Sequence, residues 1–240
     1  MGSFLLLHTC MYNVSLFIGP RVLIVPHYLS DYNCEVAFVT VNVIIPTINT
    51  TSLLMSINNW IVIQQRIDGK LSFNQNWTVY KRGFGTIDET FWLGLEKMHQ
   101  LTINAPYRLR IELQAVKNDK WLSAEYDSFF ITSELLGYAL NVLGYVGDAG
   151  DALNGISPQN GMTFSTGTGG TYASIYDEYD YMHVSICAKG YTSGFWFNQC
   201  FDACLNCVYG TKDFTWNVVS NHISVVSTNL KACRMMIKAV

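Results

Sequence analysis

The chain has 240 residues, half of them hydrophobic, and a formal net charge of −3 at pH 7. A chain of this length buries most of its unfolded surface on folding, so its core does not depend on disulfides. The small negative charge provides no attraction to nucleic acid or to an anionic membrane, and we expect neither as a partner. The 14 Tyr and 6 Trp indicate a loop-rich protein whose interior contains large amphipathic rings.

The first 30 residues contain two short apolar runs, 4–7 and 14–18, but lack the basic start of a typical signal peptide. Residues 1–30 are therefore either a divergent secretion signal or an extension that is not part of the natural mature protein. No apolar run reaches the roughly 18 to 20 residues of a membrane span, and we expect none. No linker composition occurs after residue 30, so we expect one domain over 31–240.

Three N-x-S/T sequons and seven cysteines favour a secreted, extracellular protein. The sequons predict glycosylation at Asn13, Asn49 and Asn76. An odd number of cysteines leaves at least one thiol that is free or bonded to another chain.

Alternating apolar and polar residues predict several strands. Residues 60–66 are an extended run followed by the turn signal Asp68-Gly69. Residues 107–113 alternate most clearly, and weaker alternations follow over 122–130 and 138–142. Strands with so little helix between them favour an antiparallel sheet.

One helix is expected between these strands. Residues 86–89 fit a capping box, and Phe91, Leu95 and Met98 recur at helical spacing. Gly94 weakens the helix, so it begins either near residue 86 or after Gly94.

The segment 144–170 is rich in Gly, Asn, Asp, Ser and Thr and has no periodicity. A long irregular segment inside a domain is usually functional and held by metal, disulfides or aromatic packing. The alternative is a loop without fixed structure. The cysteines and Trp196 that follow favour order.

Many motifs resemble those of the fibrinogen C-terminal domain family, over about Cys34 to Val240. They occur in the family's order: Trp60-x-Val62-x-Gln64-x-Arg66-x-Asp68-Gly69, Gly83-Phe84-Gly85, Phe91-Trp92-Leu93-Gly94, Gly147-Asp148-Ala149-Gly150-Asp151, Asn160-Gly161-Met162, Cys187-Ala188 and Gly194-Phe195-Trp196-Phe197-Asn198-x-Cys200. The resemblance implies an α+β fold with a small N-terminal subdomain, a central antiparallel sheet with short helices, and a loop-rich binding subdomain. Residues 92–99 and 194–197 are most similar to the microfibril-associated glycoprotein 4 group.

The resemblance also implies a disulfide between Cys187 and Cys200 beside the ligand site, with free buried thiols as the alternative. A loop of this size would contribute about 3 kcal/mol in the chain-entropy description of disulfides. Family members often have a cis peptide before the second cysteine, which here is Gln199–Cys200.

Relatives in the family bind calcium just before this disulfide through paired aspartates. Tyr179 and Tyr181 stand at those positions here, and residues 167–176 look like an insertion. Through a local shift, Asp177 and Asp180 could supply carboxylates instead, so calcium is the cofactor we expect. A solvated acidic loop is the alternative.

The ligand pocket of acetyl-recognising relatives lies beside the disulfide and includes a His after the second cysteine. Phe201 stands there in this chain and lacks the hydrogen-bonding capacity of an imidazole. We expect an apolar pocket suited to a methyl group. Its expected lining is Trp196, Phe197, Gln199, Phe201, Tyr209 and Trp216. For Trp196 and Trp216 the equal alternative is a structural position in the core.

The sequence Cys204-Leu-Asn-Cys207 departs from the family pattern. With Cys200 and His183 it could bind zinc. In an oxidising compartment an additional disulfide or an interchain bond is favoured.

The other cysteines have no obvious partner. Cys34 fits one half of the N-terminal disulfide of relatives, but the partner position near Met55 has no cysteine. Cys10 and Cys233 are candidates for a bond to another chain, and therefore for a homo-oligomer.

No catalytic motif accompanies the histidines. His183 and His222 could in principle partner a cysteine nucleophile, but no recognised nucleophile or zinc-protease pattern occurs, so we expect no enzyme. The predicted function is a secreted recognition protein for extracellular matrix components. The alternative is a lectin-like innate defence receptor that binds acetylated surface glycans with the help of calcium. Linked copies would strengthen weak binding in either role.

Overall fold

The computed structural model describes residues 36–45, 48–167, 186–220 and 223–240, with side chains for 54–167, 186–218 and 229–240. The chain divides into two units, with the boundary between Val62 and Ile63. Within the described residues, no helix is long and apolar enough to cross a bilayer.

The first unit contains an antiparallel hairpin. Strand β1 (Val36–Ile45) pairs with β2 (Ile48–Ile57) along its whole length, and β2 pairs with the start of β3 (Trp60–Arg66). The turn between β2 and β3 is formed by Asn58 and Asn59, both with positive φ, as a tight two-residue hairpin turn requires. Neither β1 nor β2 was expected, although Val39, Val41 and Val43 of β1 alternate with the polar Thr40 and Asn42.

The second unit is built on an antiparallel sheet in the order β3–β11–β6–β7–β8. Its further strands are β6 (Tyr107–Ala115), β7 (Trp121–Ile131), β8 (Leu140–Gly147) and β11 (Ile223–Ala239). The last strand of the chain therefore lies inside the sheet, between β3 and β6. The expected α+β class, with an antiparallel sheet and few short helices, is confirmed.

Strand β6 shows why the alternation was informative. Leu109, Ile111 and Leu113 are fully buried, whereas Arg108 and Arg110 are half-buried on the opposite face. The alternation assigned to 138–142 began two residues early. Tyr138 lies before β8, and its φ of 49° is outside the extended region, so the strand begins only after this residue.

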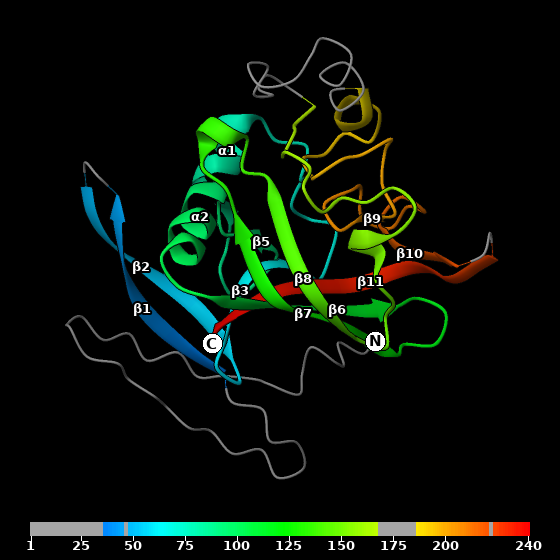
Figure 1. The fold of residues 1–240 in the computed structure, drawn as a ribbon, viewed down its shortest axis with the longest axis horizontal. Helices are drawn as coiled ribbons and strands as arrows, with labels where there is room; N and C mark the ends of the chain where they lie inside the picture. Colours follow the sequence, from blue (N-terminus) through cyan, green and yellow to red (C-terminus); the bar gives the residue numbers. More distant parts are fainter. Residues whose placement is uncertain (1–35, 46–47, 168–185, 221–222) are drawn as a thin grey trace. The chain divides into compact units, whose positions relative to one another are not determined.

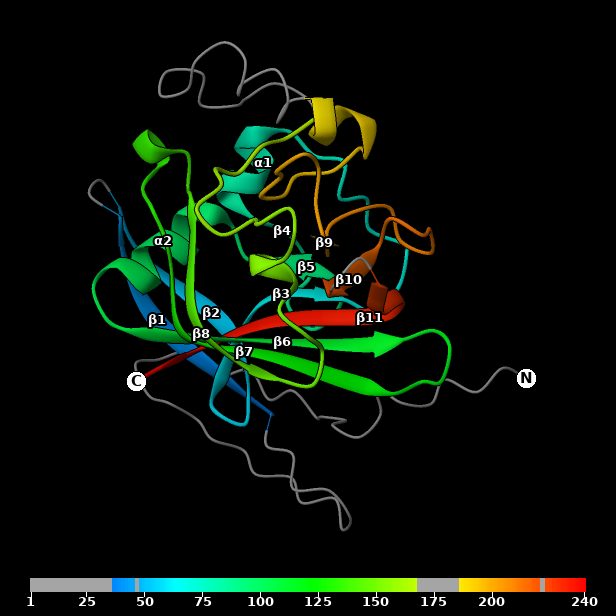
Figure 2. The same cartoon turned by 45° about the vertical axis from the view of Figure 1, so that its right-hand side comes forward.

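Two helices cover one side of this sheet, as Figures 1 and 2 both show. Helix α1 (Trp77–Arg82) is capped by Asn76 and ends at Gly83, whose φ is 94°. A side chain at position 83 would lie 2.3 Å from the carbonyl oxygen of Leu93, so glycine is required. Helix α2 (Leu95–Ile103) begins directly after Gly94.

The expected capping box at 86–89 is wrong. These residues form a turn in which the amide of Glu89 donates to the carbonyl of Thr86 at 2.9 Å. The residues that follow form β5 (Phe91–Trp92), which pairs with β3 and with β4 (Phe84–Gly85). Pairing with strands distant in sequence has overridden the local helix signal.

The loop-rich part of the second unit is ordered by specific side chains. It contains the short elements η1 (Glu134–Leu136), η2 (Ala152–Asn154), β9 (Ala203–Cys204) and β10 (Thr215–Ser220). The indole of Trp216 donates to the carbonyls of Ala149 and Gly150 at 3.2 and 3.0 Å. The hydroxyl of Tyr126 donates to Asp151 at 2.7 Å. The described part of the irregular segment, up to residue 167, is therefore fixed to the sheet.

An aromatic cluster joins the loops to the helices. Phe164 lies 5.0 Å from Tyr80, 5.7 Å from Trp92 and 5.1 Å from Trp196, measured between ring centroids. All four rings are at most 1% exposed. These contacts form the core that supports the site described below.

Candidate functional site

A disulfide between Cys187 and Cys200 defines one edge of the candidate site. Its S–S distance is 2.04 Å and its Cα–Cα distance is 5.4 Å. Cys187 is in a helical turn over residues 186–190, and Cys200 follows a cis peptide from Gln199. The bond and the cis peptide that the resemblance implied are both present.

The turn that enters Cys200 is held at both ends. The amide of Asn198 donates to the carbonyl of Cys200 at 2.6 Å, and the Asn198 side chain donates to the carbonyl of Pro158 at 2.8 Å. Gln199 has a φ of 57° and an exposed side chain. Its amide therefore projects to solvent beside the disulfide.

Three aromatic rings gather beside this turn and are referred to below as the disulfide-side cluster: Tyr191, Phe197 and Phe201. Tyr191 meets Phe201 edge to face with 4.7 Å between centroids, and Phe197 lies 5.9 Å from Phe201. Tyr191 and Phe201 are partly exposed, whereas Phe197 is fully buried beneath them. The exposed side chain of Ile186 belongs to the same helical turn as Cys187.

Tyr191 was missed by the sequence analysis. The amide of Tyr191 donates to the carbonyl of Cys187 at 3.0 Å, so one helical turn brings this ring beside the disulfide. The spacing of four residues from Cys187 was the available signal.

Trp196 and Trp216 are not walls of an open pocket. Both are fully buried, and the indole of Trp196 donates to the carbonyl of Tyr138 at 2.8 Å. Of the two interpretations of these residues, their burial supports the one that assigned them to the core.

Tyr209 lies in a different environment. Its hydroxyl donates to the carbonyl of Lys231 at 2.6 Å, and its ring packs 5.3 Å from that of Phe214. No contact of Tyr209 with the disulfide-side cluster occurs among the described residues. The expected lining thus reduces to Gln199 and Phe201 at the surface, with Phe197 behind them.

Two side chains at the end of β3 hold the loop that follows the site. The amide of Gln64 donates to the carbonyl of Leu205 at 3.1 Å, and Arg66 donates to the carbonyls of Leu205 and Cys207, both at 3.1 Å. The side chain of Asn206 then donates to the carbonyl of Gly194 at 2.9 Å. A chain of hydrogen bonds thus connects the central sheet to the segment that carries Phe197.

Arg66 is a buried cation. It is 1% exposed, lies 4.0 Å above the ring of Phe73, and its Nε has no hydrogen-bond partner. Burial lowers the pKa of Arg66 because water no longer solvates its charge. Neighbouring carbonyl oxygens and ring faces provide the compensation.

Cys204 and Cys207 form a second disulfide with an S–S distance of 1.98 Å. The zinc hypothesis for these residues is therefore wrong, because a disulfide leaves no thiolate to bind a metal.

Cys233 is a free thiol but is only 1% exposed. The prediction that it could bond to another chain is therefore wrong. Its burial raises its pKa to about 12.

Several predicted sites lie outside the described residues. These are Asn13, Asp177 and Asp180, together with Cys10, Cys34, His183 and His222. In the part of the chain that the structure describes, no group of three or more His, Cys, Asp or Glu residues is placed to bind a metal ion. Asn49 belongs to β2, and Asn76 is the exposed N-cap of α1.

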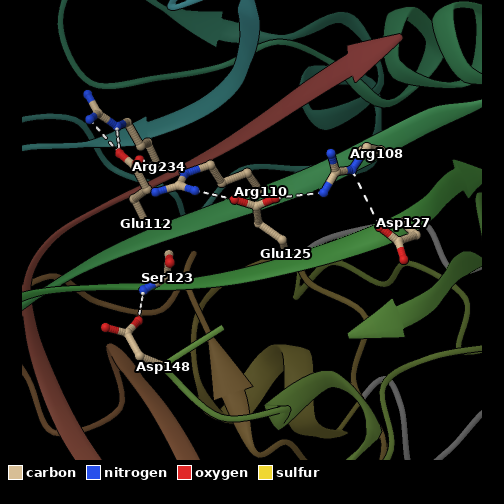
Figure 3. A network of polar contacts seen from close by, with 8 residues as sticks. All are labelled: Arg108, Arg110, Glu112, Ser123, Glu125, Asp127, Asp148 and Arg234. Carbon is tan, nitrogen blue, oxygen red and sulfur yellow. Dashed lines mark hydrogen bonds and ion pairs between the residues drawn. The ribbon is translucent and has the colours of Figure 1, made fainter. Parts of the chain in front are cut away.

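A row of charges crosses the sheet on β11, β6 and β7 (Figure 3). It consists of alternating arginines and carboxylates in the order Arg234, Glu112, Arg110, Glu125, Arg108 and Asp127. Three positive groups face three negative ones, so the row neutralises itself and presents no excess charge to a ligand. It links neighbouring strands rather than forming a binding site.

Comparison with protein families gives one match that covers most of the chain. Residues 50–240 match the model described as "Fibrinogen beta and gamma chains, C-terminal globular domain".

Three curated relatives are similar over part of their length. The Protein scabrous of Drosophila melanogaster is 35% identical over 181 residues, which are 75% of this chain and 20% of the relative. Human Fibroleukin is 36% identical over 191 residues, 75% of this chain and 42% of the relative. The Fibrinogen alpha chain of Rattus norvegicus is 39% identical over 165 residues, 66% and 21%. The chain thus spans less than half the length of these relatives.

Solved structures share the fold. The fibrinogen-like globe domain of human ANGPTL6 matches with a TM-score of 0.64 and 26% identity, over 86% of this chain and 90% of that chain. The lamprey fibrin D-dimer, complexed with a Gly-His-Arg-Pro-amide peptide, matches with a TM-score of 0.63 and 30% identity, over 78% and 65%.

Proposed function

Because this chain belongs to the family of fibrinogen C-terminal globular domains, we propose that it is a secreted, non-catalytic recognition protein that binds extracellular matrix components. Proteins with this domain, such as fibrinogen and Fibroleukin, are extracellular recognition proteins. The likeness of residues 92–99 and 194–197 to microfibril-associated glycoprotein 4 supports a matrix ligand over a soluble one.

The observation that carries the proposal is the disulfide-side cluster. Tyr191 and Phe201 are partly exposed beside a turn held by the Cys187–Cys200 disulfide and by Asn198. Rigid aromatic side chains lose little conformational entropy on binding and are common anchors of recognition sites. The uncharged rings suit a methyl or other apolar group, and the exposed amide of Gln199 adds one polar contact.

A lectin-like role for acetylated glycans is the competing function. Sugars are recognised by hydrogen bonds as well as by ring contacts, and Phe201 provides only the latter. The matrix role is therefore the function we propose. The proposal includes calcium bound by Asp177 and Asp180, and the comparison of calcium with a chelator below tests it.

The test compares immobilised elastin and collagen with an array of acetylated glycans, each with calcium and with a chelator. We expect saturable binding to a matrix protein that weakens at least about tenfold in Phe201→Ala, which corresponds to about 1.4 kcal/mol. Leu143→Ser is the matched control, since Leu143 is 68% exposed on β8 and makes no contact with the cluster among the described residues.

Two results would contradict the proposal. Calcium-dependent binding to acetylated glycans without matrix binding would establish the lectin role instead. Catalytic turnover of a substrate would show that the chain is an enzyme, provided that the activity is retained when the protein is purified.

A further inference from the structure

The side chain of Asn76 is divided between two environments. Its Oδ1 accepts a hydrogen bond from the amide of Val79 at 3.0 Å and so caps α1. Its Nδ2 takes part in none of the hydrogen bonds of the described residues, and the residue is exposed. One amide atom is therefore used by the fold, and the other faces solvent.

The neighbours of Asn76 leave this Nδ2 accessible. The indole of Trp77 is turned away and donates to Glu134 at 2.9 Å, while Thr78 is exposed. Asn76-Trp77-Thr78 is a sequon, and a folded sequon must accommodate a bulky sugar at the asparagine. The cap geometry meets this condition because only the carbonyl oxygen of the side chain is occupied.

An exposed apolar tip lies against the same helix. Glu134 in η1 accepts from Trp77 and from Lys81, at 2.9 and 2.5 Å, so η1 is attached to α1. The next two residues, Leu135 and Leu136, are 69% and 52% exposed. These two adjacent side chains form a small apolar surface beside α1 that a group attached to the helix can cover.

We propose that Asn76 carries an N-linked glycan that preserves the cap of α1 and covers Leu135 and Leu136. The proposal rests on the extracellular location given under Proposed function, since the glycan is added during secretion. The sugar donor is a lipid-pyrophosphate-linked oligosaccharide. The Nδ2 of Asn76 forms a bond to the anomeric carbon, the bond from that carbon to the pyrophosphate breaks, and the amide loses one proton as the lipid pyrophosphate departs.

Occupancy is tested on the full chain secreted from eukaryotic cells behind a heterologous signal sequence. We expect peptide:N-glycosidase to increase the gel mobility of the protein and to convert Asn76 to Asp in the corresponding peptide. An unmodified Asn76 in the secreted protein would overturn the proposal. Export directed by residues 1–30 is measured separately, so that a failure of the proposed location is distinguishable from a failure of the glycan.

Three variants separate the cap from the sugar. Asn76→Asp keeps an oxygen acceptor for the cap but removes the glycan, and Thr78→Ala removes the glycan but keeps Asn76. Asn76→Ala removes both. After enzymatic removal of glycans from all samples, we expect Asn76→Ala alone to show a lower thermal midpoint. Equal midpoints for all four proteins would contradict a cap at Asn76.

Coverage of the leucines is measured by binding of an apolar fluorescent dye. We expect Thr78→Ala and Asn76→Asp to bind severalfold more dye than the glycosylated protein. Adding Leu135→Ser and Leu136→Ser to Thr78→Ala should abolish the increase. Equal dye binding by the glycosylated protein and both sugar-free variants would overturn the covering role.

Discussion

Arg66 shows at the scale of one residue how this fold accommodates a buried charge. Its guanidinium donates to the carbonyls of Leu205 and Cys207 and lies over the ring of Phe73. None of the described ion pairs includes Arg66, so carbonyl dipoles and a ring face replace water around the charge. The positions of the loop carbonyls and of the arginine therefore depend on each other.

Arg66→Ala should lower the free energy of unfolding by about 3 kcal/mol, because it leaves the buried carbonyl of Cys207 without a donor and opens a cavity, while the carbonyl of Leu205 keeps Gln64. Arg66→Lys should cost less but still more than about 1 kcal/mol, since an ammonium is more strongly hydrated and lacks the planar guanidinium that lies over the ring of Phe73. Urea denaturation measures both values. Arg82→Ala, at an exposed position, is the control and should stay within about 0.5 kcal/mol. A loss of similar size in the control would show that the effect is not specific to burial.

At the scale of elements, two disulfides of different loop size stabilise the segment around the site. Cys187 and Cys200 are 13 residues apart in sequence, whereas Cys204 and Cys207 are 3 apart. The loop of residues 204–207 is also held by Gln64 and Arg66 from β3. The smaller disulfide therefore supports a loop that already has other contacts.

The double variant Cys204→Ala with Cys207→Ala should lower the free energy of unfolding by about 2 kcal/mol, and the pair Cys187→Ala with Cys200→Ala by about 3 kcal/mol. Loop-closure entropy in the unfolded chain is the reason for this order. Denaturant unfolding under oxidising conditions measures the difference. The reverse order would mean that native contacts, rather than loop size, set the contribution of each bond.

The charged row across the sheet should contribute modestly, because its members are partly exposed. Glu112 accepts from Arg110 and Arg234 on two different strands. Glu112→Gln should cost about 1 kcal/mol at low salt and less at high salt, where screening weakens the ion pairs. Urea titrations at both salt concentrations check this, with the exposed Glu89→Gln as control. A cost that does not change with salt would indicate packing rather than charge.

At the scale of the whole molecule, buried thiol and phenol groups make the free energy of unfolding depend on pH in the alkaline range. Burial raises the pKa of Cys233 from about 9 to about 12, and burial also raises the pKa of Tyr80 and Tyr126. The folded state therefore keeps these groups neutral at a pH where the unfolded chain releases their protons. The folded state binds more protons in this range, so the free energy of unfolding must fall as pH rises.

We expect the free energy of unfolding to decline above about pH 9, the ordinary value for a thiol. Cys233 alone should contribute a slope of up to about 1.4 kcal/mol per pH unit between its unfolded and folded pKa values. Cys233→Ala removes this part while the tyrosines remain, so its curve should be flatter. Parallel curves for the two proteins, followed by urea denaturation at several pH values, would show that the thiol is not buried as described.

The sequence by itself determined the family, the antiparallel sheet and its best strands. The alternation in β6 and the extended run of β3 were sufficient because their side chains obey a period of two. The Cys187–Cys200 bond followed from the resemblance, since its two motifs occur in order. Local pattern also placed the start of α2 after Gly94 as one of two alternatives.

Only the tertiary structure decided which side chains reach the surface of the site. Trp196 and Trp216 are of a residue type common in ligand pockets. Their burial, however, depends on partners such as Tyr138 and Ala149 that are distant in sequence. The turn at 86–89 was mistaken for a helix because the pairing of β5 with β3 is not encoded locally. Long-range contacts, which carry no periodic signal, settled these points.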